Sequence, residues 1–176
     1  MKKMKKNFII LFLIALIPIK AFALIEVDIT RGNLNPLPLA VSPLSIDAQS
    51  RKNFEKILKK ENIGSEISAI VENNLRTSGL FNPLTKDAFL QAPDIANLKP
   101  RFEDWNLIKA QALITGKVTY VDEKLRVEFR LWDVLAAKEM MALAFTTVPS
   151  NWRRVGHIIS DKVYERLTGE KGYFDT

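Results

Sequence analysis

The sequence predicts an α/β sandwich with a mixed β-sheet. Segments that alternate polar and apolar residues, as strands do, are interleaved with segments whose apolar residues recur every three or four positions, as in helices. The chain has 176 residues, and the 153 that follow a predicted targeting segment of 23 residues suit one domain with its own core. Helices between strands favour this class over an all-β fold.

The first 23 residues have the anatomy of a secretory signal peptide. Lysines are concentrated at the N-terminus, Phe8 to Ile19 is an apolar run, and Ala21-Phe22-Ala23 resembles a cleavage site. A membrane-spanning helix needs about 20 apolar residues, and Lys20 interrupts the run before that length. We therefore expect residues 1–23 to be removed and residues 24–176 to form the exported domain, with an uncleaved membrane anchor as the alternative.

Composition narrows the classes of function. Of the 26 basic and 20 acidic residues, five lysines and no acid fall in positions 1–23, which leaves 21 basic against 20 acidic residues. A polyanion-binding surface needs a concentrated positive excess, so we do not expect nucleic acid as a partner. The chain has no cysteine, which removes disulfide bonds and the acceptor for a bacterial lipid anchor.

The first half of the predicted domain alternates between strand and helix. Glu26 to Thr30 has the period of a half-buried strand, and Leu39-Ala40-Val41 is a short buried strand closed by a proline. Ser50 to Asn62 indicates a short basic amphipathic helix, or a loop with helical tendency, that docks on the domain, with attachment to a membrane surface as the alternative. The next helix is expected to begin at an N-cap, Ser65, and to end at Gly79.

The second half predicts an antiparallel meander between helices. Phe81 to Leu84 indicates a short strand, Gln91 to Pro100 a loop, and Phe102 to Ile108 a helix. The three strands of the meander are Ile114 to Val121, Leu125 to Asp133 and Lys138 to Val148, with a turn at Asp122-Glu123-Lys124. Ser150 or Asn151 is expected to cap a last helix that ends at Gly169.

The sequence lacks the residue sets that catalysis or cofactor binding requires. His157 is the one imidazole, and no nucleophile motif accompanies it, so a structural role is the favoured interpretation. Zinc ligands and phosphate-binding glycine motifs are also missing, and we expect no metal and no cofactor. The acidic pairs Glu103-Asp104 and Asp122-Glu123 are interpreted as solvent-facing groups, and the three tryptophans, Trp105, Trp132 and Trp152, as packing residues.

A colinear set of short segments resembles the N-terminal domain of the TolB family, the periplasmic component of the Tol-Pal system. The segments are Ile29-Thr30-Arg31-Gly32, Pro38-Leu39-Ala40-Val41-Ser42-Pro43-Leu44, Asn74-Leu75-Arg76-Thr77-Ser78-Gly79-Leu80-Phe81, Ile114-Thr115-Gly116-Lys117-Val118, Phe129-Arg130-Leu131-Trp132-Asp133, Trp152-Arg153-Arg154-Val155-Gly156-His157 and Lys162 through Gly169. The resemblance covers essentially all of residues 25 to 174. It implies a three-layer sandwich with a five-stranded mixed sheet and flanking helices.

The resemblance also implies a function without enzyme activity. Proteins of this family join the inner-membrane Tol proteins to the peptidoglycan-associated lipoprotein Pal, and so support outer-membrane integrity and constriction at division. Their mature N-terminus contacts TolA. Carried over to this sequence, the contact falls on Glu26, Val27, Asp28, Ile29, Thr30, Arg31 and Gly32. An exposed alternating strand is suited to extending a partner's sheet, whereas the alternative is an ordinary strand of this domain's own sheet.

Two departures from the family limit what is carried over. Family members continue into a C-terminal β-propeller that binds Pal, whereas this chain stops at Thr176, so Pal binding is expected only where a propeller is supplied. The hypothesis is then a truncated or split member, or an N-terminal piece of one, and we expect it to present its N-terminal segment constitutively. Gln49 to Asn62 is longer and richer in lysine than the usual family loop, and nothing is carried onto it. An independent periplasmic ligand-binding or chaperone-like domain is the alternative function.

Overall fold

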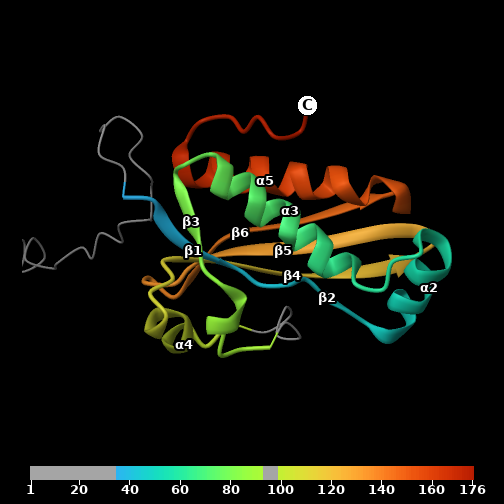
Figure 1. Ribbon diagram of the computed structural model, residues 1–176, viewed down its shortest axis with the longest axis horizontal. Coiled ribbons are helices and arrows are strands. Elements are labelled where there is room, and N and C mark those ends of the chain that lie inside the picture. Colours follow the sequence, from blue (N-terminus) through green and yellow to red (C-terminus); the bar gives the residue numbers. More distant parts are fainter. Residues whose placement is uncertain (1–34, 93–98) are drawn as a thin grey trace, which may run out of the picture.

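The structure of the protein, a computed structural model, describes residues 35–92 and 99–176 (Figure 1). At its centre five strands lie in the order β3-β1-β4-β5-β6. They are β1 (Leu37–Val41), β3 (Phe81–Pro83), β4 (Ala112–Val121), β5 (Lys124–Asp133) and β6 (Lys138–Thr147), and a two-residue strand, β2 (Ser45–Ile46), pairs with β4 off this path. β1 is parallel to β3 and β4, whereas β4, β5 and β6 are antiparallel. The predicted mixed five-stranded sheet is confirmed.

β1 lies inside the sheet, as its apolar sequence predicts. Its partners are β3 on one side and β4 on the other, and Leu39, Ala40 and Val41 are each at most 2% exposed. Strands that are covered on both faces have continuous rather than alternating apolar sequences. The sheet therefore holds this segment between two neighbouring strands, one position in from the β3 edge.

The meander follows the predicted hairpin with a tighter turn. β4 ends at Val121 and β5 begins at Lys124, so the turn consists of Asp122 and Glu123 alone. Both have positive φ, 50° and 59°, which is the conformation of a two-residue hairpin turn whose twist matches that of the strands. Lys124, which was predicted in the turn, is the first residue of β5.

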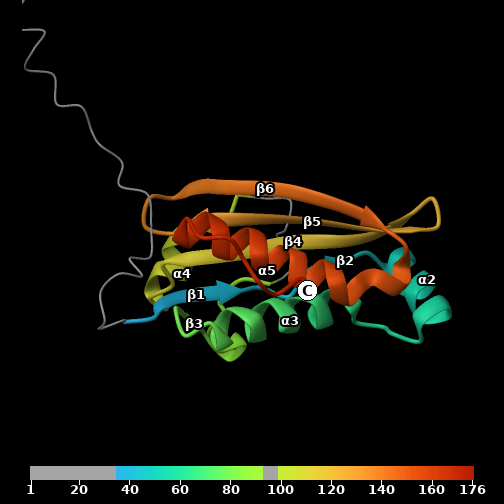
Figure 2. The same ribbon diagram turned by 90° about the horizontal axis from the view of Figure 1, so that it is seen from above.

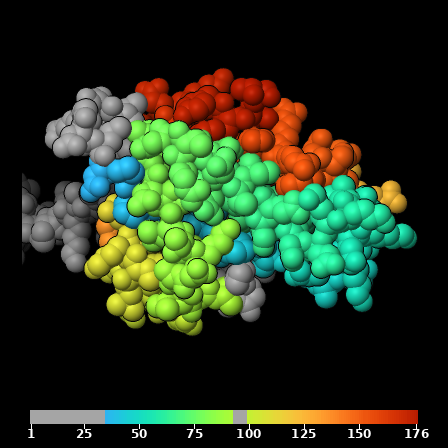
Figure 3. Space-filling model, in the orientation of Figure 1, coloured from blue at the N-terminus to red at the C-terminus, as the bar shows by residue number. Residues whose placement is uncertain are grey.

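Two long helices cover one face of the sheet. α3 (Ile63–Thr77) and α5 (Trp152–Thr168) pack against each other, and their buried side chains meet those of β1, β4 and β5 in the larger of two apolar cores. Figure 3 shows α3 in green crossing the molecule below α5 in red. Gly169 ends α5 with a φ of 76°, as predicted, and Asn151 occupies the N-cap position of this helix after a single 3₁₀ turn, Pro149–Asn151.

The basic helix α2 (Ala48–Leu58) docks on the domain. Phe54 is fully buried and meets the Tyr120 ring edge to face, with 5.4 Å between ring centroids. Leu58 packs against the same core, and Ile57 remains half exposed. Because Phe54 and Leu58 pack against the protein, two of the three apolar side chains needed for membrane attachment are already occupied.

Among residues 35–92 and 99–176, helices and turns cover the second face of the sheet at one end only. There α4 (Phe102–Leu107) and a 3₁₀ turn, η1 (Lys86–Ala88), form a thinner third layer. Trp105 and Trp132 are buried under it, and their indole N–H groups donate to Gln91 and Thr115 over 2.7 Å and 2.9 Å. The predicted packing role of these tryptophans is confirmed, as it is for Trp152, which is 5% exposed.

The predicted boundaries of two helices are wrong. α2 begins after an N-cap at Asp47 and ends at Leu58, whereas the sequence predicted Ser50 to Asn62. α3 begins at Ile63 after Asn62, so Ser65 lies inside its first turn and is not the N-cap. The physical reason is tertiary: Gly64 lies against the Leu44 backbone and Ile63 is fully buried, and these contacts place the N-cap at Asn62, three residues before Ser65. Within the described ranges, no helix has both the length and the apolar character that crossing a membrane would require.

Candidate functional site

The predicted partner-binding strand lies outside the described residues. Glu26, Val27, Asp28, Ile29, Thr30, Arg31 and Gly32 all precede residue 35, as do the predicted signal peptide and its cleavage site. The structure does describe the point at which the chain after them enters the fold. That point is Leu37, the first residue of β1.

Leu37 is fixed at one end of the sheet by backbone hydrogen bonds on both sides. Its N–H donates to the Leu80 carbonyl over 2.9 Å, and the next carbonyl, that of Pro38, accepts from Gln111 N–H over 2.9 Å. Gly32 precedes Leu37 by five positions, and five extended residues span at most about 18 Å. The end of the predicted binding strand is therefore tethered within that distance of the sheet end where β1 begins.

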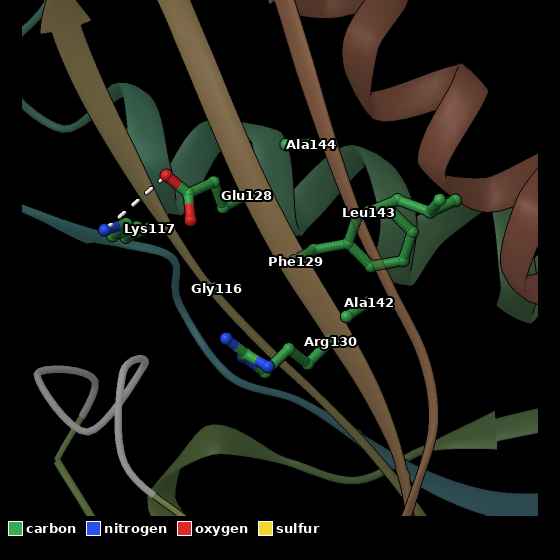
Figure 4. A pocket seen from close by; sticks show the side chains of 8 residues that line it. All are labelled: Gly116, Lys117, Glu128, Phe129, Arg130, Ala142, Leu143 and Ala144. Carbon is green, nitrogen blue, oxygen red and sulfur yellow. Dashed lines mark ion pairs between the residues drawn. The ribbon is translucent and has the colours of Figure 1, made fainter.

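The uncovered part of the second sheet face carries a set of charged side chains. Arg126, Glu128 and Arg130 alternate along β5, and Lys117 lies beside them on β4, where it pairs with Glu128. Figure 4 shows Lys117, Glu128 and Arg130 around a shallow hollow floored by the small side chains of Ala142 and Ala144. The hollow has a volume of about 190 Å³.

These charges neutralise one another. Glu128 lies 3.0 Å from Arg126 and 3.5 Å from Lys117, and Arg130 pairs with Glu139 of β6 over 2.7 Å. Partial burial by itself raises the pKa of Glu128, but the hydrogen bond from Arg126 and the charges of Lys117 and Arg126 together outweigh it and hold the pKa below its ordinary value. The result is a polar surface on which each of the three basic side chains has an acidic partner, Lys117 and Arg126 sharing Glu128.

The sequence analysis assigned no function to this charged surface, although the alternation along one strand indicates it. The alternation of Leu125 to Asp133 places Arg126, Glu128 and Arg130 on one face of a strand, and that pattern was used only to predict the strand. What the sequence cannot supply is the register that sets Lys117 beside Glu128. It also cannot show that α4 leaves this part of the face uncovered.

His157 lies at the contact between α3 and α5. Its Nδ1 accepts a hydrogen bond from the Asn74 amide over 2.9 Å, and the same amide nitrogen donates to Ser160 Oγ over 3.0 Å. Asn74 and Ser160 are buried, so this small polar network ties the two helices together inside the larger core. A hydrogen bond to a buried asparagine of a neighbouring helix is consistent with a structural role for His157.

No catalytic or metal-binding constellation accompanies these groups in the part of the chain that the structure describes. Among residues 35–92 and 99–176, no three His, Asp or Glu side chains gather as a cation site requires. Glu103 and Asp104 lie in the first turn of α4, where Asp104 pairs with Arg101 over 2.7 Å, and Asp122 and Glu123 form the hairpin turn.

Comparison with known proteins identifies the family. Residues 25–140 match the family model described as the TolB amino-terminal domain. The chain is 86% identical, over 167 residues, to the "Tol-Pal system protein TolB" of Pelagibacter ubique (strain HTCC1062); the match covers 95% of this chain and 37% of the relative. The crystal structure of TolB from Acinetobacter baumannii has the same fold, with a TM-score of 0.64 and 22% identity over 86% of this chain and 33% of that one.

The chain thus spans about 37% of the length of the curated relative that it matches. The family is non-enzymatic, in agreement with a sequence that offers no catalytic set. The family match begins at residue 25 and ends at residue 140, so it includes β1 to β5 completely and the first three residues of β6. This chain belongs to the TolB amino-terminal domain family.

Proposed function

We propose that this chain acts as a periplasmic adaptor of the Tol-Pal system. In this role it links the inner-membrane Tol proteins to the outer-membrane lipoprotein Pal, and so contributes to envelope integrity and to constriction of the outer membrane at cell division. The observation that carries the proposal is the 86% identity, over 95% of this chain, to a protein named as TolB of that system. At such identity the fold and surface residues are largely shared.

The working part of the adaptor is the strand Glu26 to Gly32, which contacts a TolA-like protein. Its polar and apolar residues alternate, with Val27 and Ile29 on one face. A strand of this kind gains affinity from backbone hydrogen bonds when it extends a partner's sheet, and specificity from alternate side chains. The firm attachment of β1 at Leu37 supports this role, because force or motion of the partner is transmitted directly to the central sheet.

Pal is expected to bind only together with a propeller. The family resemblance gives Pal binding to the C-terminal β-propeller, and the residues of this chain match only the amino-terminal domain model. We therefore assign TolA contact to this chain and leave Pal contact to a propeller supplied with it.

Calorimetric titration against the C-terminal domain of the cognate TolA tests the proposal. Residues 24–176 should bind, and the same chain without residues 24–32 should not. A sharper variant replaces Val27 and Ile29 by aspartate, which removes the apolar face of the strand while leaving the backbone length unchanged. The matched control replaces Leu107 and Leu135, two exposed residues outside the strand, by aspartate, and it should bind like the parent chain.

Two outcomes would contradict this assignment. Binding that survives removal of residues 24–32 would place the TolA contact elsewhere on the domain. No binding by the parent chain, while its circular dichroism and unfolding transition are those of a folded domain, would mean that this domain does not suffice as the adaptor.

The alternative of an independent ligand-binding domain has less support. Small-molecule sites are clefts of about 300–1,000 Å³ lined by apolar side chains and a few convergent polar groups. The hollow over β4 to β6 measures about 190 Å³, and a second one, between β6 and α5, about 290 Å³. Neither exceeds the lower end of that range.

A further inference from the structure

β6 forms a long, uncharged outer edge of the sheet. It pairs with β5 alone among the described residues, and Figure 2 shows it as the outermost strand. Met140 to Val148 contains no charged residue and no proline. The opposite edge is β3, which has three residues and ends in Pro83. Proteins normally shield such an edge with charges, prolines or a covering segment, so the contrast between the two edges calls for an explanation.

Only the beginning of β6 is shielded. The Met140 carbonyl accepts a hydrogen bond from Arg166 Nε over 3.3 Å, Glu139 pairs with Arg130, and the register shifts at Leu131/Trp132 on β5, opposite this point. From Met141 to Thr147 no comparable protection exists in the described part of the molecule. We call the outward side of Met141 to Thr147 the β6 edge.

The side chains of the β6 edge are apolar and partly exposed. Register with β5 places Met141, Leu143 and Phe145 on the face that carries α3 and α5. Met141 and Phe145 pack against the larger core, and Phe145 stacks on Phe129 with 6.1 Å between centroids. Leu143, between them, is 37% exposed. An apolar side chain that faces the helices but remains this exposed lacks a neighbour on its outer side.

The sequence of this edge is complementary to itself. In an antiparallel pair of two β6 strands centred on Leu143, Met141 of one copy lies opposite Phe145 of the other, Ala142 opposite Ala144, and Leu143 opposite Leu143. The charged residues Lys138 and Glu139 then face Val148 and Thr147, so no like charges meet across the pair. A two-fold axis repeats each of these pairings once on either side of Leu143, so the same match is made twice in the dimer.

A hollow in the surface fits this arrangement. A cavity of about 290 Å³ lies beside the β6 edge against α5, and its walls include Phe145, Val155 and Ile158. In the register centred on Leu143, the residue opposite Phe145 is Met141 of the second copy, whose side chain points to the same face of the sheet. Methionine is unbranched and flexible and fills irregular apolar gaps. The two-fold axis gives each copy one such methionine for its hollow.

We infer that the β6 edge is a docking surface for a second copy of this chain. The two copies join their sheets through an antiparallel β6–β6 pair centred on Leu143, with Met141 of each copy seated beside Phe145 of the other. This surface lies three strands away from β1, where the predicted TolA-binding strand is attached, so the dimer leaves that strand free. The inference does not depend on the proposed adaptor function.

Sedimentation velocity of residues 24–176 over a wide concentration range tests the inference. We expect a monomer–dimer equilibrium in the parent chain. Leu143→Lys and Leu143→Glu should each weaken dimerisation at least about tenfold, because like charges face each other across the axis and a buried leucine pair is lost. Leu107→Lys, on exposed α4, is the matched control and should dimerise like the parent.

Mixing the two Leu143 variants separates this register from other modes of association. Leu143→Lys and Leu143→Glu should form a mixed dimer that neither forms alone, because opposite charges then meet on the axis. A dimer that is indifferent to Leu143, or a mixture that stays monomeric, would overturn the inference. A parent chain that stays monomeric up to its solubility limit would also overturn the inference. This holds even if a different protein protects the β6 edge from hydrogen exchange.

Cysteine cross-linking tests the register directly, since the chain has no cysteine of its own. Directly opposite residues in an antiparallel pair lie about 4.5–5.5 Å apart between Cα atoms, within disulfide reach. Leu143→Cys should therefore form a covalent dimer under mild oxidation, and so should a mixture of Met141→Cys with Phe145→Cys. Leu107→Cys is the control for random collision, and equal cross-linking by it would overturn the inference.

Discussion

Ser68 and Gly64 show how single residues fix the start of α3 on the rest of the fold. Ser68 Oγ accepts the Leu44 N–H over 2.9 Å and can donate to the Ser42 carbonyl over 3.1 Å, so a buried loop has its backbone groups satisfied by one hydroxyl. Gly64, one turn earlier, lets the Leu44 carbonyl approach closer than any side chain would allow. The helix and the loop are therefore locked together by two small residues.

Gly64→Ala is expected to destabilise the domain by about 1–3 kcal/mol, the usual cost of overpacking. The added Cβ would clash with the Leu44 carbonyl, which is backbone and cannot move aside easily. Alanine's better helix propensity offsets at most about 1 kcal/mol of this. Urea unfolding measures the effect, with Ser65→Ala, at the exposed neighbouring position, as a control that should stay within about 0.5 kcal/mol. Equal stability of the two variants would contradict the close packing.

Asp47 gives α2 a pH-dependent N-cap. Its Oδ1 accepts the Ser50 N–H over 2.8 Å. Hydrogen bonds from Ser50 lower the pKa of Asp47 below the ordinary value of 3.8, and the side chain of Ser50 contributes more than its backbone N–H. A carboxyl group with a lowered pKa contributes stability above its unfolded pKa and loses that contribution as the pH falls through the folded pKa.

Asp47→Ala should therefore lower the free energy of unfolding by about 1 kcal/mol at neutral pH, the typical value of an N-cap. The difference from the parent chain should shrink as the pH falls below the ordinary pKa, because the parent's own cap is then protonated. Asp47→Asn keeps a capping oxygen and should show a smaller loss at neutral pH. Urea unfolding of the three proteins across this pH range measures the difference, and a constant difference would show that the charge has no part in it.

At the scale of elements, the end of α2 is a place where the sequence conflicts with the backbone. Lys59 closes the helix in a left-handed conformation, with φ 57° and ψ 37°, and its N–H donates to the Glu55 carbonyl. Glycine is the residue that usually occupies such a position, because a side chain makes this conformation costly. The stability of α2 therefore rests on its buried Phe54 more than on its C-terminal cap.

Lys59→Gly should raise the free energy of unfolding by up to about 1 kcal/mol, because it relieves the left-handed strain. The same change inside the helix, Lys56→Gly, should have the opposite sign and lower it by about 1 kcal/mol. Thermal unfolding of both variants measures the contrast. Two variants that shift the midpoint in the same direction would show that α2 does not end in this conformation.

The elements also show which patterns predict well. The meander and the last helix were predicted nearly to their ends, because their periodicity is sustained over ten or more residues and their turns have specific residues such as Gly169. The start of α3 was missed, because the burial of Ile63 and the contact of Gly64 with Leu44 are tertiary features that no local signal reports. The tight turn at Asp122-Glu123 was missed by one residue, since neither residue is the glycine that usually marks it.

At the scale of the whole molecule, export remains a prediction from the first 23 residues. When the full chain is expressed in a Gram-negative host, the protein recovered from the periplasm should begin at Leu24, as measured by intact mass and N-terminal sequencing. The apolar run from Phe8 to Ile19 is interrupted by Lys20 and is too short to anchor the chain in the membrane. Recovery of a protein that starts at Met1 in the membrane fraction would favour the uncleaved anchor instead.

The sequence by itself determined the fold class, the order of most elements and the family, because periodicity and a colinear set of short segments are properties of the chain alone. It also indicated the candidate binding strand, Glu26 to Gly32, which lies outside the described residues. Only the tertiary structure decided that β1 is interior, that Lys117 meets Glu128, and that β6 is an open edge beside a hollow. Strand order and register join residues far apart in sequence, and no local pattern encodes which strand is left at the edge.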